Sequence, residues 1–141
     1  MAEVLVLETS AFLDLVVGNE EGRAVRDALR SHLVHVSDHA GLAVAMALRA
    51  MTRRQLLSAA QLARGIQLLA TAPFISHPAL SLLPAAMSKS DLRLGDALCV
   101  ELSDRLAAPL VTTDARLATV WPRCWLITVP IAGPRPASAP A

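Results

Sequence analysis

Carboxylate side chains stand at the ends of apolar segments in this sequence. Glu8 follows the apolar run Val4–Leu7, Asp38 and Asp114 follow two further runs, and Asp96 lies early in an apolar helical pattern. Carboxylates that do not all pair with arginine are costly to bury together unless a cation joins them. Oxygen ligands favour Mg²⁺ or Mn²⁺, which polarise a phosphoryl oxygen and activate water. These residues therefore indicate metal-dependent phosphodiester hydrolysis, with helix capping or surface charge as the alternative for each acid.

Short apolar runs alternate with helical patterns along the chain, and these elements must position the acids. The patterns predict strands at 4–7, 33–36, 110–113 and 125–129, with 74–77 as either a strand or an extended link. They predict helices at 11–17, 20–32, 41–51, 55–70, 80–87, 92–106 and 115–120. This alternation predicts an α/β fold, a three-layer α/β/α sandwich with a central, mostly parallel sheet. In such a sheet the acids that follow strands, Glu8, Asp38 and Asp114, are expected to converge at one edge.

The composition fits one domain. The chain has 141 residues, of which 54% are hydrophobic, yet no apolar run reaches the roughly 18 to 20 residues that span a bilayer. We therefore expect no membrane segment, and Glu3 and Glu8 without a basic leader argue against a signal peptide. The segment 130–141 is rich in proline and alanine, which predicts a disordered tail after a folded domain at 1–129.

Charge and cysteine content narrow the function classes. The net charge is +1, so no overall basic field indicates nucleic-acid binding. The two cysteines, Cys99 and Cys124, form neither a disulfide framework nor a zinc-ligand spacing. Cys99 lies in an apolar helical pattern, which predicts an inert core thiol. These features favour a reducing, cytoplasmic location.

Two segments resemble the PIN-domain family. VLVLETSAFLDLV, residues 4–16, resembles the family's first motif, a strand followed by an acid, a small residue, serine and an apolar helix. LRLGDALCVELSDRLAAPLVTTDARLA, residues 92–118, resembles the last two motifs, D-A-x-x-V-x-L-A and L-V-T-x-D-x-R-L. The resemblance covers roughly residues 3 to 129, and the most similar members are VapC-type toxins of bacterial toxin–antitoxin pairs. It implies a small Mg²⁺- or Mn²⁺-dependent endoribonuclease, usually dimeric and inhibited by an antitoxin protein.

The resemblance also assigns expected roles to residues. Glu8, Asp96 and Asp114 match the family's first, third and fourth acids and are expected to hold the metal and act in catalysis. Ser10 and Thr112 match hydroxyl residues that support those acids. Basic residues that commonly flank the motifs, and that would bind RNA, fall at Arg93 and Arg116. For these arginines, solvent-exposed helix charge is the alternative interpretation.

The sequence departs from the family pattern at two acidic positions. The first acid is normally aspartate, and the extra methylene of Glu8 moves the carboxylate by more than the near-octahedral geometry of Mg²⁺ tolerates easily. The second acid is normally a glutamate in the third helix, and Ala43 stands there. Asp38 would face elsewhere and is better explained as a helix N-cap, a position that Ser37 could also take. His39 shares a helix face with Ala43 but lies one turn earlier and is a softer ligand.

Two functional hypotheses remain. The first is an active or weakened PIN ribonuclease that uses the three remaining acids. The second is a catalytically degenerate PIN domain that binds RNA or protein without cutting. In either case, the apolar stripe along 55–70 offers two interpretations: it packs on the protein's own core, or it forms a homodimer interface.

Overall fold

Five parallel strands form one sheet at the centre of the protein. The computed structural model describes residues 2–130, so the predicted tail at 130–141 lies, after its first residue, outside the described residues. The strand order is β3-β2-β1-β4-β5, with every neighbouring pair parallel. The strands are β1 (Val4–Leu7), β2 (Leu33–Ser37), β3 (Ile75–His77), β4 (Leu110–Thr112) and β5 (Cys124–Leu126). The predicted parallel α/β sheet is therefore confirmed, with 75–77 as a strand.

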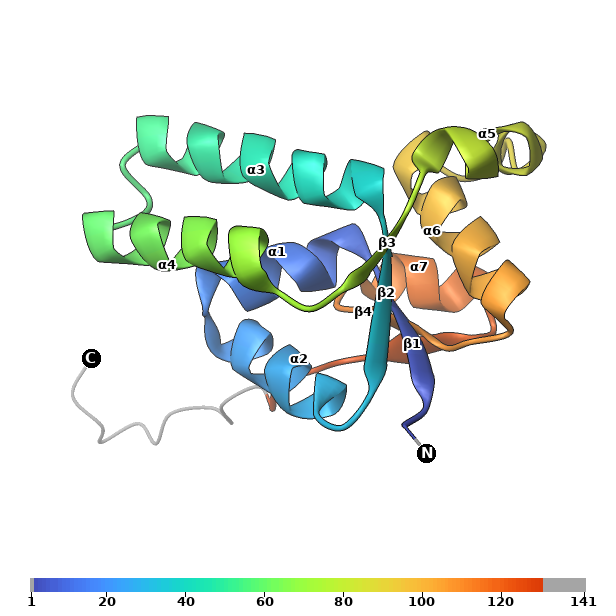
Figure 1. Cartoon of the computed structure of the whole chain (residues 1–141), viewed down its shortest axis with the longest axis horizontal. Coiled ribbons are helices and arrows are strands. Elements are labelled where there is room, and N and C mark those ends of the chain that lie inside the picture. The colour runs from blue at the N-terminus through green and yellow to red at the C-terminus, as the bar shows by residue number, and fades with distance from the viewer. Residues whose placement is uncertain (1, 131–141) are drawn as a thin grey trace, which may run out of the picture.

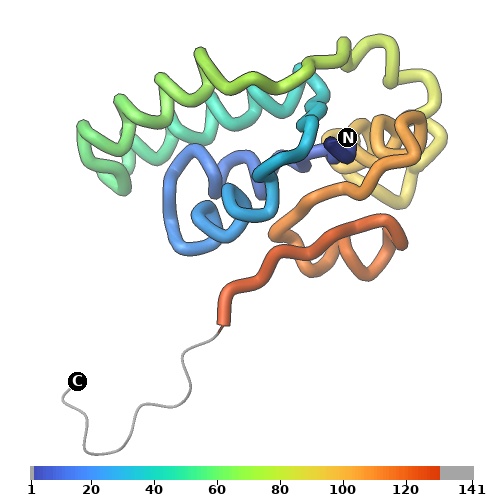
Figure 2. Tube along the Cα trace, turned by 60° about the horizontal axis from the view of Figure 1, so that its bottom comes forward, coloured from blue at the N-terminus to red at the C-terminus, as the bar shows by residue number. Residues whose placement is uncertain are grey.

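Helices cover both faces of the sheet, as Figures 1 and 2 show. One face is covered by α1 (Thr9–Val17), α2 (Glu20–Leu29), α3 (Asp38–Arg53) and α4 (Ala59–Thr71). The other is covered by α5 (Ala79–Met87), α6 (Leu94–Leu106) and α7 (Ala115–Val120). Both views place α3 and α4 side by side, away from the C-terminal half. The three-layer α/β/α sandwich is confirmed.

The alternation of side chains along β1 explains the two cores. Leu5 and Leu7 enter the core under α1 to α4, whereas Val6 enters the core under α5 to α7. Successive residues of a strand point to opposite faces, so a strand covered on both faces must be apolar throughout. The run Val4–Leu7 has that pattern, and it occupies the centre of the sheet.

Several helix boundaries differ from the sequence-based expectation. The second helix ends at Leu29, before the predicted end at 32, because Ser31 adopts a left-handed backbone with φ of 63°. The helix expected from 55 begins at Ala59, where Ser58 and Gln61 form a capping box. Gln55 lies in the preceding turn, also with a positive φ of 58°. A left-handed backbone residue therefore ends α2, and a polar capping box begins α4, although the apolar periodicity extends beyond both boundaries.

Parallel pairing brings the carboxyl ends of β1, β2 and β4 to one edge of the sheet. Glu8 directly follows β1, Ser37 ends β2, and Thr112 ends β4. All three side chains are almost fully buried. Proline usually limits a helix, yet Pro84 lies inside α5. Within residues 2–130, no helix has both the length and the apolar character needed to cross a bilayer.

Candidate active site

The carboxylates of Asp96 and Asp114 lie at the carboxyl edge of the sheet, near enough to repel each other electrostatically. Asp96 lies in the first turn of α6, and Asp114 is the N-cap of α7. Burial raises the pKa of Asp96, and the nearby Asp114 carboxylate raises it further, while Arg93 and Arg116 act in the opposite direction. Two carboxylates that repel each other in a partly buried place favour a cation or a shared proton.

Arg93 and Arg116 lie beside this pair of acids. Together with Asp96 they line a cavity of about 280 Å³ between the start of α6 and α7. Arg116 also forms an ion pair with Asp114, with its Nη2 3.6 Å from Oδ2, and it remains 64% exposed. The acids and the arginines expected from the sequence therefore share one surface.

The Glu8 carboxylate turns into the protein and accepts three hydrogen bonds. Oε1 accepts from the Ser10 amide at 2.9 Å, and Oε2 accepts from the hydroxyls of Ser10 and of Thr112, the latter at 2.7 Å. Glu8 is only 3% exposed and caps the N-terminus of α1. A buried carboxylate needs such donors. The longer side chain thus serves as a helix cap as well as an acid at the sheet edge.

Thr112 links Glu8 to the loop that carries Asp114. Its hydroxyl donates to Glu8 and accepts from the Asp114 amide at 2.9 Å. The next residue, Thr113, donates to Asp14 Oδ2 at 2.7 Å and more weakly to Ser10 Oγ at 3.3 Å. Sequence reasoning missed Asp14, because its position inside an apolar helix gave no sign of a partner so far along the chain.

The position of the missing second acid, Ala43, lies one helical turn after His39. Ala43 on α3 is half-buried. His39 Nδ1 lies 2.6 Å from Ser37 Oγ, and its Nε2 is buried without a hydrogen-bond partner among the described residues. A side chain at position 95 would begin 3.5 Å from that nitrogen. Burial lowers the pKa of His39, although the Gly95 backbone and the charges of Asp38 and Glu8 oppose the shift.

Asp38 has a different role from the one expected. The prediction that it caps its own helix is wrong, because Ser37 is the N-cap residue and Asp38 is the first residue of α3. The Asp38 carboxylate instead accepts from the Ala79 amide at 2.8 Å, at the start of α5. A free amide at a helix start is a ready partner for a carboxylate. Asp38 is thus engaged in joining α3 to α5.

The donor set suits a divalent cation only in part. Within residues 2–130, no three His, Cys, Asp or Glu side chains gather closely enough to enclose an ion. Mg²⁺, however, commonly binds through one or two carboxylates and completes its shell with water and substrate phosphate. The mutually repelling Asp96 and Asp114 fit that kind of site. Glu8 Oε1 accepts only the Ser10 amide among the described groups.

Two further features lie outside this site. His35 Nδ1 and His77 Nε2, on neighbouring strands, lie 2.7 Å apart, a pairing that the sequence did not reveal. Burial lowers the pKa of His35, and His77 adds to the effect. Cys99 is fully buried, which raises the pKa of its thiol to about 12, so the prediction of an inert core thiol is confirmed.

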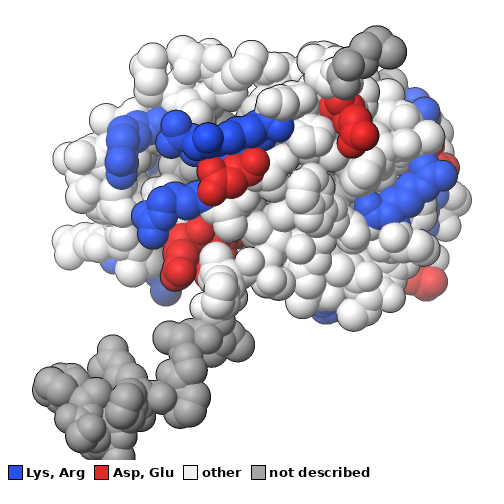
Figure 3. All heavy atoms as spheres, turned by 90° about the horizontal axis from the view of Figure 1, so that it is seen from below, with Lys and Arg blue, Asp and Glu red and all other residues white. Residues whose placement is uncertain are grey.

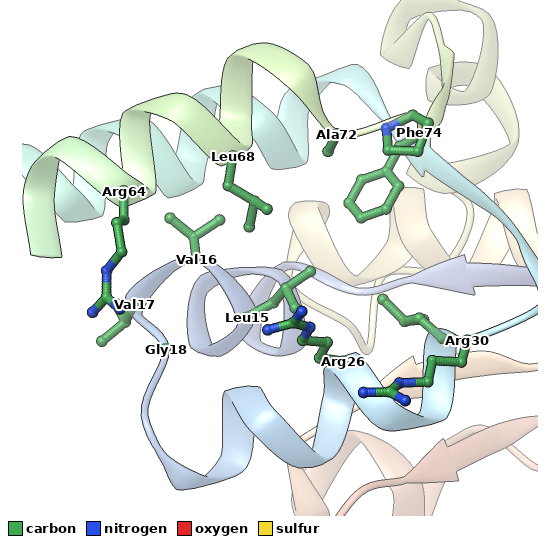
Figure 4. A pocket seen from close by; sticks show the side chains of 12 residues that line it. Leu15, Val16, Val17, Gly18, Arg26, Arg30, Arg64, Leu68, Ala72 and Phe74 are labelled. Atoms are coloured by element: carbon green, nitrogen blue, oxygen red, sulfur yellow. The ribbon is translucent and has the colours of Figure 1, made fainter.

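The surface carries a separate apolar cleft of about 460 Å³ between α1, α2 and α4 (Figure 4). Val16, Leu68 and Phe74 point into it, while arginines of α2, of the turn after α2 and of α4 stand around it. Those arginines are Arg26, Arg30 and Arg64.

On the face seen in Figure 3, basic and acidic side chains form alternating patches rather than one basic field, in keeping with the net charge of +1.

Comparison with known proteins gives one consistent family. The PIN domain matches residues 5–120 of the chain. Ribonuclease VapC3 of Mycobacterium tuberculosis is 38% identical over 122 residues, covering 85% of this chain and 89% of the relative. Ribonuclease VapC12 of the same organism is 32% identical over 121 residues, covering 82% and 90%.

A solved structure supports the same fold. A chain of a toxin–antitoxin complex from Klebsiella pneumoniae superposes with a TM-score of 0.61 at 17% identity, covering 88% of this chain and 98% of that one. At that identity the likeness concerns the fold alone. The matched sequence segments, the parallel sheet and the two similar relatives together establish that the chain belongs to the PIN-domain family, among its VapC-type members.

Proposed function

We propose that the protein is a VapC-type endoribonuclease that hydrolyses RNA phosphodiester bonds with a divalent metal ion. The observation that carries the proposal is the juxtaposition of Asp96 and Asp114 beside two arginines. Burial, and then the charge of Asp114, raise the pKa of Asp96. A pair of acids that demands a cation, next to side chains that bind phosphate, is the arrangement that metal-dependent phosphodiester hydrolysis needs.

Each residue has a role in this proposal. Asp96 and Asp114 hold Mg²⁺ or Mn²⁺, and Glu8 contributes through Oε1. When bound there, a divalent ion would supply Lewis-acid chemistry to the phosphoryl group and to water. Arg93 and Arg116 bind the RNA backbone through their guanidinium groups. The supporting hydroxyls are Ser10 and Thr112, which fix Glu8 and the Asp114 loop.

A catalytically degenerate PIN domain that binds RNA or protein is the second candidate. Ala43 supports it, because this chain lacks an acid where the family pattern has one. The Glu8 carboxylate supports it as well, because three donors already engage it. Such a domain would keep the arginine surface and lose the affinity for metal.

Metal binding separates these two candidates. Calorimetric titration with Mn²⁺ and Mg²⁺ is expected to give saturable binding that Asp96→Asn abolishes. Asp104→Asn, at an exposed acid near the other end of α6, should preserve it. RNA cleavage assays on the same proteins would then follow. Absence of binding at millimolar metal would favour the degenerate domain. Binding that survives Asp96→Asn would refute this choice of ligands.

A protein partner of the antitoxin type is the second part of the proposal. It rests on membership of the VapC-type group and on the structural neighbour, which is a toxin–antitoxin complex. The apolar cleft with its three arginines suits a segment that carries both apolar and acidic side chains. Arg64→Glu is expected to weaken binding of a small protein encoded beside this gene, whereas Arg54→Glu, outside the cleft, should not.

We also propose that the protein acts in the cytoplasm as a homodimer. The stripe predicted on residues 55–70 faces outward, with Leu56 and Ile66 both 56% exposed. On the neighbouring α3, Leu42 and Met46 are 66% and 64% exposed. Exposed apolar residues on adjacent helices are typical of association surfaces. Sedimentation is expected to give a dimer that Ile66→Glu dissociates, and a monomer at micromolar concentration would refute the proposal.

A further inference from the structure

We propose that His35 and His77 form a binding site for a transition-metal ion such as Ni²⁺, Cu²⁺ or Zn²⁺. His35 Nδ1 and His77 Nε2 lie 2.7 Å apart, and the centroids of the two rings lie 5.0 Å apart. This site shares no residue with the acids at the carboxyl edge of the sheet. It therefore does not depend on the proposed ribonuclease activity.

The pairing of two neighbouring strands brings these imidazoles together. His77 on β3 pairs with Ser37, two residues after His35 on β2, so the histidines are diagonal neighbours. Residues two apart on a strand share a face of the sheet. Val34 and Val36 lie in the core under α1 to α4, so the histidines lie on the opposite face. Because β3 is the edge strand and both side chains are only half-buried, ions in solution can reach them.

The two rings offer the ligand chemistry that transition metals prefer. Neutral imidazole suits nickel, copper and zinc, whereas Mg²⁺ prefers oxygen ligands. Burial lowers the pKa of His35, and the charge of His77 lowers it further, so the His35 ring is neutral at pH 7. In the metal-free pair, one of the facing nitrogens donates a hydrogen to the other. When a metal binds, that hydrogen moves through solvent to the second nitrogen of its own ring, and both facing nitrogens then present lone pairs.

The distance between the two nitrogens favours an ion whose ligands stand at a right angle. Two nitrogens about 2.0–2.1 Å from one ion lie roughly 2.9 Å apart at a right angle and roughly 3.3 Å apart at the tetrahedral angle. The observed 2.7 Å is closer to the first value. A small rotation of each ring would direct both lone pairs at one ion. Since Ni²⁺ and Cu²⁺ favour such positions, we expect them to bind more tightly than Zn²⁺.

Water would complete the coordination of this ion. Among residues 2–130, no third His, Cys, Asp or Glu side chain joins the pair. The ion would link β2 to β3, a strand of only three residues that connects α4 to α5. A ligand that binds the folded chain and not the unfolded chain raises the stability of the fold. Metal binding should therefore raise the midpoint of thermal unfolding.

Calorimetric titration with Ni²⁺ tests the site, on protein from which any polyhistidine tag has been removed. In excess Mg²⁺, the wild type is expected to bind one Ni²⁺ per chain at this pair. His77→Gln should weaken the affinity about tenfold or more, because even the contacts that support metal ligands are worth about 10- to 100-fold. Ni²⁺ should also raise the unfolding midpoint of the wild type and leave that of His77→Gln unchanged.

His32→Gln is the matched control for His77→Gln. His32 precedes β2 and lies outside the pair, with its Nε2 3.9 Å from a carboxylate oxygen of Glu3. Its replacement should change neither the Ni²⁺ affinity nor the metal-dependent shift of the midpoint. An equal loss of affinity in both variants would overturn the assignment of the ligands.

Electron paramagnetic resonance of bound Cu²⁺ gives a second test that needs no variant. At one equivalent of Cu²⁺, coupling to two imidazole nitrogens is expected, and coupling to fewer would overturn the proposal. Loss of Ni²⁺ binding in Asp96→Asn would place the ion at the acids and would also overturn it. Equal Ni²⁺ affinity of wild type and His77→Gln, or no saturable binding, would leave the pair as a hydrogen bond between strands. The ribonuclease proposal would stand in each of these cases.

Discussion

Replacing Thr112 with valine tests the hydrogen-bond network that joins β1 to the loop after β4. Thr112 is fully buried, and valine has nearly the same shape without the hydroxyl. The substitution removes the 2.7 Å bond to Glu8 Oε2 and the 2.9 Å bond from the Asp114 amide. It leaves a buried carboxylate with fewer donors and an amide without its acceptor.

The expected cost follows from these two lost bonds. A hydrogen bond to a charged group contributes about 1.5–3 kcal/mol, and a neutral one contributes about 1 kcal/mol. Thr112→Val should therefore lower the free energy of unfolding by roughly 2–4 kcal/mol. Urea denaturation at pH 7 and fixed protein concentration, followed by circular dichroism, measures the change.

Thr119→Val is the matched control for this prediction. Thr119 is exposed on α7, and among residues 2–130 its hydroxyl bonds only the Arg116 carbonyl of the same helix, at 2.6 Å. Its replacement should change stability by no more than about 0.5 kcal/mol. If Thr112→Val costs as little as this control, the network does not hold Glu8 and the Asp114 loop together, and the argument from burial is refuted.

Three further predictions concern charge, packing and thiol chemistry. Asp96→Asn should raise the free energy of unfolding of the metal-free protein at pH 7, because the raised pKa of Asp96 means that folding disfavours its ionised carboxylate. This gain in stability should shrink as the pH falls through the usual carboxyl range near 4, and a gain independent of pH would contradict the prediction. Gly41→Ala should raise the free energy of unfolding by about 0.5–1 kcal/mol, since its Cβ meets nothing within 4 Å. Gly22→Ala should lower it by about 2 kcal/mol or more, since its Cβ would lie 1.9 Å from a backbone carbonyl oxygen of α1. Similar urea midpoints for the two variants would be inconsistent with this packing. A disulfide reagent at pH 8 should modify Cys99 and Cys124 slowly in the folded protein and rapidly in urea. Burial raises the pKa of Cys99 to about 12 and that of Cys124 to about 11. Rapid labelling of both thiols in the native protein would rule out the packing of Cys99.

Much of the fold could be predicted because the apolar pattern is local. The runs at β1, β2 and β4 have the continuous apolar character of strands buried on both faces, and the structure has strands there. Strand–helix alternation then leaves few topologies besides a parallel sheet with helices on both sides. Motif spacing predicted that Asp96, Asp114 and two arginines belong to one site. In the structure these acids lie on one surface with Arg93 and Arg116.

Side-chain partners across the fold could not be predicted in the same way. Asp38 was expected to cap its own helix, yet it bonds the Ala79 amide, because the start of α5 happens to lie next to it. The stripe on 55–70 was open to two interpretations, and the structure turns it outward, since Gly65 permits close packing of the opposite face against Val16 and Leu48. Both outcomes depend on which elements become neighbours.

The sequence by itself determined the order of strands and helices, the family, and the residue types available at the sheet edge, because these depend on local periodicity and motif spacing. Only the tertiary structure decided what each carboxylate does. Glu8 accepts from Thr112, 104 residues away, Asp14 accepts from Thr113, and Asp96 is left to face Asp114. The physical reason is that desolvation and hydrogen bonding act on whichever groups the folded chain brings into contact, and sequence distance does not record those contacts.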